Sequence, residues 1–99
     1  MSSQIALLGA DHGGRQALLS ELAPRLRGTP FVPQLVGEFD ELQSPALVLL
    51  IASDARGEET DLRWRERLVA AGMAFSVLHG NAQARLEGAW QLIAPLLGI

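Results

Sequence analysis

The chain contains no lysine, no cysteine and no tyrosine among its 99 residues. All eight basic residues are arginines, so any mechanism that requires a lysine amine is excluded. The missing cysteines exclude disulfides, thiolate nucleophiles and thiolate zinc sites, and the missing tyrosines exclude phenolic acid–base chemistry. The chemistry open to this chain therefore depends on arginine, histidine and carboxylate side chains.

Charge and the length of the apolar runs restrict the partners. Eleven acidic residues and eight arginines give a formal net charge of −3 without an obvious basic patch, which does not favour nucleic acid. The longest apolar run, residues 46–52, is far too short to span a bilayer, and no basic leader precedes the first run. We expect a cytoplasmic protein that binds neither nucleic acid nor membrane, and its lysine-free, arginine-containing composition suits a GC-rich bacterial genome.

Hydrophobic residues make up 48% of the chain, enough for the core of one domain. Two continuous apolar runs, 5–8 and 46–52, and the similar, mostly apolar segment 73–78 are typical of strands buried on both faces of a parallel sheet. A weaker extended segment, 31–36, contains Pro33, which favours a sheet edge. Helices are expected over 14–26, from Thr60 to Ala71 with Thr60 as the N-cap, and after Asn81 as the cap of the last helix.

The order of these elements predicts the fold. Strands and helices that alternate with short connections form a right-handed three-layer α/β/α unit, here one domain over residues 1–99. We expect a mainly parallel four-stranded sheet in the order 2-1-3-4, because this order places the Pro33 strand at an edge. Such an architecture is Rossmann-like or flavodoxin-like. Pro24 and Pro95 are expected to kink or end the first and last helices.

In sheets of this kind, ligands bind at the carboxyl ends of the strands, near the point where the strand order reverses. The turn after the first strand has glycines that allow backbone N–H groups to wrap an anion at a helix N-terminus. Polar residues after the third and fourth strands are expected at the same edge. The candidate phosphate- or nucleotide-binding residues are Gly9, Asp11, His12, Gly13, Gly14, Arg15, Asp54, Arg56, His79 and Asn81.

Residues 9–16, Gly-Ala-Asp-His-Gly-Gly-Arg-Gln, resemble the P-loop of bacterial GTPases, and residues 47–57 resemble a later strand of that family. The resemblance implies phosphate binding at the first turn. Arg15 stands in place of the family's lysine, Gln16 replaces the hydroxyl that holds magnesium, and the switch segment is missing. NTP hydrolysis is therefore not expected.

Nearly the whole chain is also similar to a response-regulator receiver domain, through its strand spacing, residues 18–22, residues 46–50 and the ending over 87–95. That family uses an acidic magnesium cluster, an aspartate that accepts phosphate, and a lysine. Here the cluster reduces to Asp11, Ile51 aligns with the acceptor, Asp54 follows three residues later, and the lysine is absent. The resemblance implies a degenerate receiver that signals without aspartyl phosphate. The run 9–14 is further similar to the opening of bacterial ribose-5-phosphate isomerase B, whose cysteine base is missing here.

The expected helix from Thr60 to Ala71 carries a second feature. Its apolar residues spread over about half of the circumference at roughly 100° per residue, and Arg65 lies among them. One interpretation is that Arg65 lays its methylenes along the surface with its head in water. The alternative is a second apolar patch of Trp64 and Leu68, flanked by arginines 63 and 67, that docks a partner or a second copy. The candidate interface residues are Trp64, Arg65 and Leu68.

These observations favour a non-catalytic binding or regulatory module, a receiver-like or Rossmann-like interaction domain without catalytic residue, cofactor or metal. Its partners would be a second copy or another protein at the Thr60 to Ala71 helix. An alternative is a binder of a phosphate-containing small molecule through Gly9 to Arg15, and a more distant one is a small hydrolase or isomerase using His12 and Asp54. Structural roles in their turns remain the simpler interpretation of both histidines.

Overall fold

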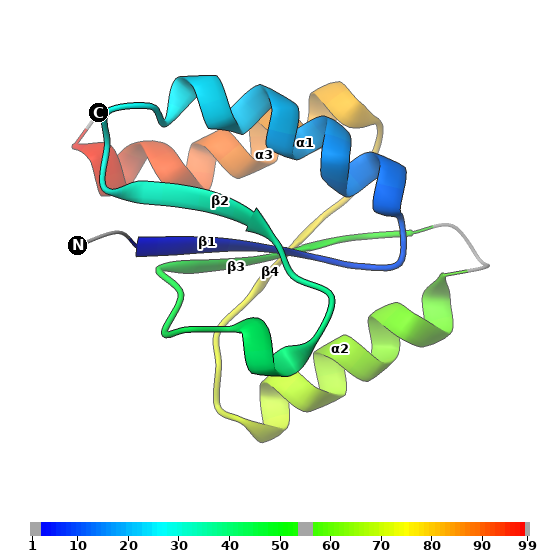
Figure 1. Ribbon diagram of the computed structural model, residues 1–99. Coiled ribbons are helices and arrows are strands. Elements are labelled where there is room, and N and C mark those ends of the chain that lie inside the picture. Colours follow the sequence, from blue (N-terminus) through cyan, green and yellow to red (C-terminus); the bar gives the residue numbers. More distant parts are fainter. Residues whose placement is uncertain (1–2, 54–56, 99) are drawn as a thin grey trace.

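The computed structural model describes residues 3–53 and 57–98 of the chain. Four strands alternate with three α-helices and two short 3-10 helices (Figure 1). In chain order the elements are β1 (Ser3–Leu8), α1 (His12–Arg25), β2 (Phe31–Leu35), η1 (Phe39–Glu41), β3 (Leu47–Ile51), α2 (Glu58–Ala70), β4 (Ser76–Leu78), α3 (Ala82–Ile93) and η2 (Ala94–Leu97).

The sheet has the order β2-β1-β3-β4, and each neighbouring pair is parallel, as the sequence predicts. Pro33 pairs with Ile5 in the edge strand β2, where its missing N–H costs no hydrogen bond on the open side. This order, with helices on both faces, is consistent with a flavodoxin-like fold.

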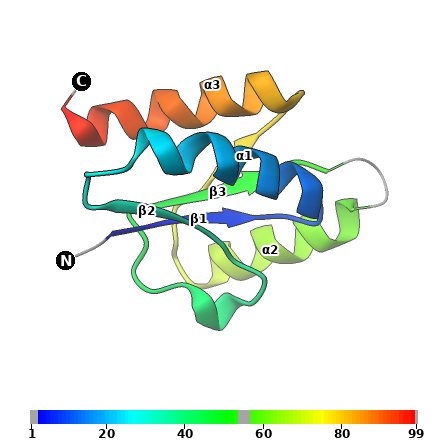
Figure 2. The ribbon, with the colours of Figure 1, turned by 45° about the horizontal axis from the view of Figure 1, so that its top comes forward.

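Figures 1 and 2 show the three layers: α1 and α3 cover one face of the sheet, and α2 with η1 covers the other. Successive residues of the central strands point to opposite faces. Ile5 and Leu7 join the α1 and α3 side, whereas Ala6 and Leu8 join the α2 side. This division explains why the central strands are continuous apolar runs. The three leucines at positions 18, 22 and 26, spaced four residues apart along the first helix and its C-cap, are all buried.

The helix boundaries differ from the expected ones in two places. The first helix begins at His12 with Asp11 as its N-cap, two residues before the predicted start. The expected Thr60 cap is wrong, since α2 begins at Glu58 with Gly57 in the N-cap position. In both cases the preceding turn is shorter than the sequence suggests. Asn81 does cap the last helix, because its side chain accepts a hydrogen bond from the Ala84 N–H at 2.9 Å.

The fourth strand is also shorter than expected. Only Ser76–Leu78 pair with β3, and the preceding residues of the predicted strand 73–78 are not part of the ladder. Both prolines act as predicted. α1 ends at Arg25, one residue after Pro24, and α3 gives way to the 3-10 helix η2, which contains Pro95. In the described ranges, no helix combines the length and the apolar character that crossing a membrane requires.

Candidate functional site

The strand order reverses between β1 and β3, which lie side by side in the middle of the sheet. The chain leaves β1 toward α1 on one face and leaves β3 toward α2 on the other (Figure 2). The crevice between the turns that follow these two strands is where doubly wound sheets bind ligands. We call this position in the fold the switch-point crevice, and we define its two sides as residues 9–11 after β1 and residues 52–53 after β3.

Asp61, in the first turn of α2, bridges the two sides of this crevice. Its side chain is buried, with 6% of the residue exposed. One carboxylate oxygen accepts a hydrogen bond from the Ala10 N–H at 3.2 Å, and the other accepts one from the Ser53 N–H at 2.9 Å. Two backbone donors that face the ligand position in such folds are therefore satisfied by the protein's own carboxylate.

A second bridge crosses the crevice from the α3 side. The Asp11 carboxylate accepts a hydrogen bond from the Gly14 N–H at 2.9 Å and contacts the Arg85 guanidinium at 3.2 Å. Arg85 also donates to the Ala52 carbonyl at 2.8 Å, and only 14% of its side chain is exposed. The Gly14 N–H, with support from Arg85, holds the pKa of Asp11 below its usual value although partial burial opposes the shift. The N-terminus of α1 thus already holds an anionic group.

Gly9 and Gly14 of the first turn have structural reasons that involve no ligand, whereas Gly13 has none. Gly9 has φ of +131°, and a Cβ there would lie 2.6 Å from the Ile51 carbonyl oxygen, so only glycine allows β1 this close to the end of β3. A Cβ on Gly14 would overlap the Asp11 carboxylate and the Arg85 guanidinium. Gly13 is exposed, and the nearest atom to a Cβ there is an Asp11 oxygen at 3.8 Å.

The two basic groups of the first turn are also engaged. Arg15 donates a hydrogen bond to the Val36 carbonyl at 3.1 Å, which ties α1 to the end of β2. A second guanidinium nitrogen of Arg15 lies 3.3 Å from Nδ1 of His12, an exposed residue. Arg15 is therefore directed toward the edge of the sheet, and Arg85 takes the position beside Asp11.

The remaining candidates fall into two groups. Asp54 and Arg56 lie outside the described residues. His79 is exposed just after β4 and lines a cleft of about 450 Å³ beside the N-terminal half of α2, together with Ala52, Ser53, Glu58, Asp61, Leu62 and Arg65. Within residues 3–53 and 57–98, no three histidine, aspartate or glutamate side chains are grouped closely enough to hold a metal ion.

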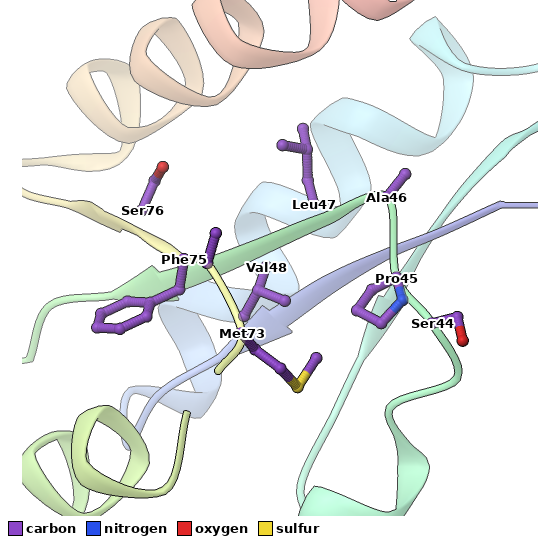
Figure 3. Close-up of a pocket in the computed structure, with 9 residues that line it drawn as sticks. Ser44, Pro45, Ala46, Leu47, Val48, Met73, Phe75 and Ser76 are labelled. Carbon is purple, nitrogen blue, oxygen red and sulfur yellow. The ribbon is translucent and has the colours of Figure 1, made fainter. Parts of the chain in front are cut away.

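A second cleft, of about 370 Å³, lies at the opposite, amino ends of β3 and β4 (Figure 3). Figure 3 shows Val48, Met73 and Pro45 on its α2 side, while Leu47 points to the other face of the sheet. Its lining is apolar apart from Ser44 and Ser76, and none of the lining side chains is ionisable. This cleft therefore offers a small apolar recess and no acid–base chemistry.

The three predicted interface residues on α2 differ in how far they are exposed to solvent. Leu68 has none of its surface exposed and packs in the core with Leu8 and Leu50, so it is not part of a surface patch. Trp64 is partly buried against the same cluster. Arg65 is exposed, as expected for a head group in water. The large apolar residues that α2 exposes are instead Leu62 and Val69.

Of the three bridging residues, the sequence pointed to Asp11 but not to Asp61 or Arg85, although a signal was present for each of these two. Asp61 lies three residues before Trp64 and seven before the core residue Leu68, which places it on the sheet-facing stripe of α2. Arg85 stands four and eight residues before Ala89 and Ile93, both fully buried. A charged residue on such a stripe needs partners, and both residues find them at the switch-point crevice.

Fold and site together define this chain as a small α/β domain with a four-stranded parallel sheet and a switch-point crevice bridged by its own side chains. Comparison with protein-family models, curated proteins and solved structures found no match to this chain.

Proposed function

We propose that this chain is a non-catalytic binding or regulatory module, in which the flavodoxin-like scaffold presents surfaces and the switch-point crevice is a structural joint. The observation that supports this proposal most is the pair of bridges by Asp61 and by Asp11 with Arg85. Each bridge occupies hydrogen-bond donors that a bound phosphate would need, namely backbone N–H groups and, in the second bridge, the Arg85 guanidinium.

Phosphate binding at the first turn would require several of these contacts to break. A phosphate at the start of α1 competes with the Asp11 carboxylate for the Gly14 N–H, and a phosphate between the two sides competes with Asp61 for the Ala10 and Ser53 N–H groups. Both carboxylates would also repel the incoming anion. The described geometry therefore favours the module over the anion binder as a function.

Amide shifts on titration with inorganic phosphate, ATP, GTP and dinucleotides test this proposal. We expect the amide signals of Gly13, Gly14 and Arg15 to stay unmoved, because the N-terminal turn of α1 is already capped. Saturable shifts at these three amides would overturn the proposal in favour of the phosphate binder. Turnover of a phosphate ester that is lost in a His12→Ala variant would overturn it in favour of the small hydrolase.

A further inference from the structure

Another cleft, of about 340 Å³, lies between α2 and the segment that leads into η1. Figures 1 and 2 both show η1 beside α2 on the same side of the sheet. The α2 residues of its lining follow the spacing i, i+3, i+4 and i+7, so they form one face of the helix. We call it the arginine–aromatic cleft, and its lining consists of Gly37, Glu38, Phe39, Thr60, Arg63, Trp64 and Arg67.

Two aromatic rings form part of the lining of the arginine–aromatic cleft. The chain has only two tryptophans and three phenylalanines, and Trp64 and Phe39 both line this cleft. Both rings are partly buried, because they also pack against the core cluster on the α2 side of the sheet. Packing against the core restricts the movement of both rings. Their open parts therefore offer a fixed apolar surface to a planar ligand.

Arg67 supplies a positioned cation in this cleft. Its guanidinium carbon lies over the Phe39 ring, 4.6 Å from the ring centre. This contact orients the guanidinium, while the N–H donors in the plane of the group can still bind a carboxylate. None of the ion pairs found in the described part of the chain involves Arg67, whereas Arg63 is paired with Glu59 at 2.8 Å. The guanidinium of Arg67 is thus available to an anionic ligand.

The carboxylates around the cleft limit the charge that it can accept. Glu38 lines the cleft and forms a capping box with Glu41 at the start of η1. The Glu41 carboxylate accepts hydrogen bonds from the Gly37 and Glu38 N–H groups at 3.2 and 2.8 Å. Asp40 lines the cleft beside β2 instead. One negative charge can therefore pair with the guanidinium, whereas a second charge on the same ligand would be repelled by these carboxylates.

We propose that the arginine–aromatic cleft binds a small aromatic monocarboxylate, with the carboxylate on the Arg67 guanidinium and the ring against the Trp64 indole. Such a ligand matches the aromatic lining, the single available cation and a volume at the lower end of the range for small-molecule sites. The inference rests on the proposed function as a binding module and names a class of ligand for it. Because Arg67 is exposed to solvent, we expect a dissociation constant of about 1 mM.

Titration with benzoate, followed through the two indole N–H signals in nitrogen-edited NMR spectra, tests the site. We expect a saturable shift of the Trp64 signal and an unmoved Trp90 signal, because Trp90 packs against the core on the other face of the sheet. Benzamide lacks the charge and acetate lacks the ring, so each binds about tenfold more weakly than benzoate. Phenyl phosphate also binds more weakly, because of its second charge.

Two arginine variants separate the contact from a general effect of charge. Arg67→Gln removes the cation of the cleft and is expected to weaken benzoate binding by about tenfold. Arg65→Gln is the matched control, because it changes the net charge equally at an exposed position of the same helix that lines a different cleft. Its affinity for benzoate should equal that of the wild type. Circular dichroism checks that both variants keep the wild-type fold.

A Trp64 signal that stays unmoved at about 50 mM benzoate would overturn the inference, since that concentration saturates a millimolar site. Equal losses in the two arginine variants would overturn it as well, and so would acetate that binds as tightly as benzoate. Tighter binding of phenyl phosphate would overturn the carboxylate class. These failures are distinct from failure of the proposed function, which is measured by phosphate-induced shifts at Gly13 and Gly14.

Discussion

Asp61 connects two backbone segments that belong to different layers of the molecule. Its two oxygens hold the Ala10 and Ser53 N–H groups, one from the turn after β1 and one from the turn after β3. A buried carboxylate that is fully hydrogen-bonded is tolerated, whereas the same donors without an acceptor are costly. The two hydrogen bonds therefore give the buried aspartate a structural role.

Replacing Asp61 by alanine removes the acceptor for both amides. We expect Asp61→Ala to lower the free energy of unfolding by about 2–3 kcal/mol, because two partly buried N–H groups lose their partner. Urea unfolding followed by circular dichroism measures this change. Glu58→Ala is the matched control, since it removes an exposed carboxylate from the same helical turn and should cost about 0.5 kcal/mol or less. Equal losses for the two variants would contradict the bridging role.

The roles of several single residues could not be predicted from the sequence. The acidic residues at positions 58, 59 and 61 look alike as a solvated group, and only the position of Asp61 on the Leu68 stripe distinguishes it. The glycines at positions 9 and 14 fit a phosphate loop equally well, because a glycine requirement does not reveal which group needs the space. Hydrogen-bond partners far apart in sequence, such as Arg85 and Asp11, decide between these interpretations.

The helices and strands themselves were largely predictable. The apolar segments predicted three strands, and Pro33 predicted the edge strand. The prolines at positions 24 and 95 predicted two helix ends. These features were predictable because each has a direct cause in the local sequence. The starts of α1 and α2 were misplaced, since Asp11 was interpreted as part of a ligand loop and Thr60 as a cap. At both starts the choice of cap depends on the neighbouring loop, which local sequence does not define.

The cap of α1 predicts a pH dependence. The pKa of Asp11 is lowered in the folded protein, mainly by the Gly14 N–H and further by Arg85. The ionised group therefore adds stability above its unfolded pKa of about 3.9, and this contribution is lost as the pH falls through the lower folded value. Because 40% of the Asp11 side chain is exposed, solvent screening keeps the contribution under about 1 kcal/mol.

The difference in unfolding free energy between wild type and Asp11→Asn isolates this group from the other carboxylates. Asparagine keeps an oxygen acceptor at the N-cap and loses the charge that Arg85 contacts. We expect the wild-type advantage to be constant from pH 7 to about pH 5 and to shrink below about pH 4. An advantage that grows as the pH falls would contradict the proposed cause.

At the scale of the whole molecule, side chains of the chain itself cross the edge of the sheet at which folds of this kind usually bind ligands. The two bridges join β1, β3, α2 and α3 at one point, so the crevice acts as a joint between layers. The surfaces open to recognition include the exposed face of α2, the clefts at the two ends of β3 and β4, and a cleft of about 720 Å³ beside β2 and η1.

Phosphate titration of the Asp11→Ala variant beside the wild type tests the closed crevice most directly. Removing the carboxylate frees the Gly14 N–H and leaves Arg85 without its anionic partner, which re-creates an anion site at the start of α1. The account predicts saturable phosphate-induced shifts of the Gly13 and Gly14 amides in Asp11→Ala and unmoved amides in the wild type. Wild-type shifts as large as those of the variant would contradict it.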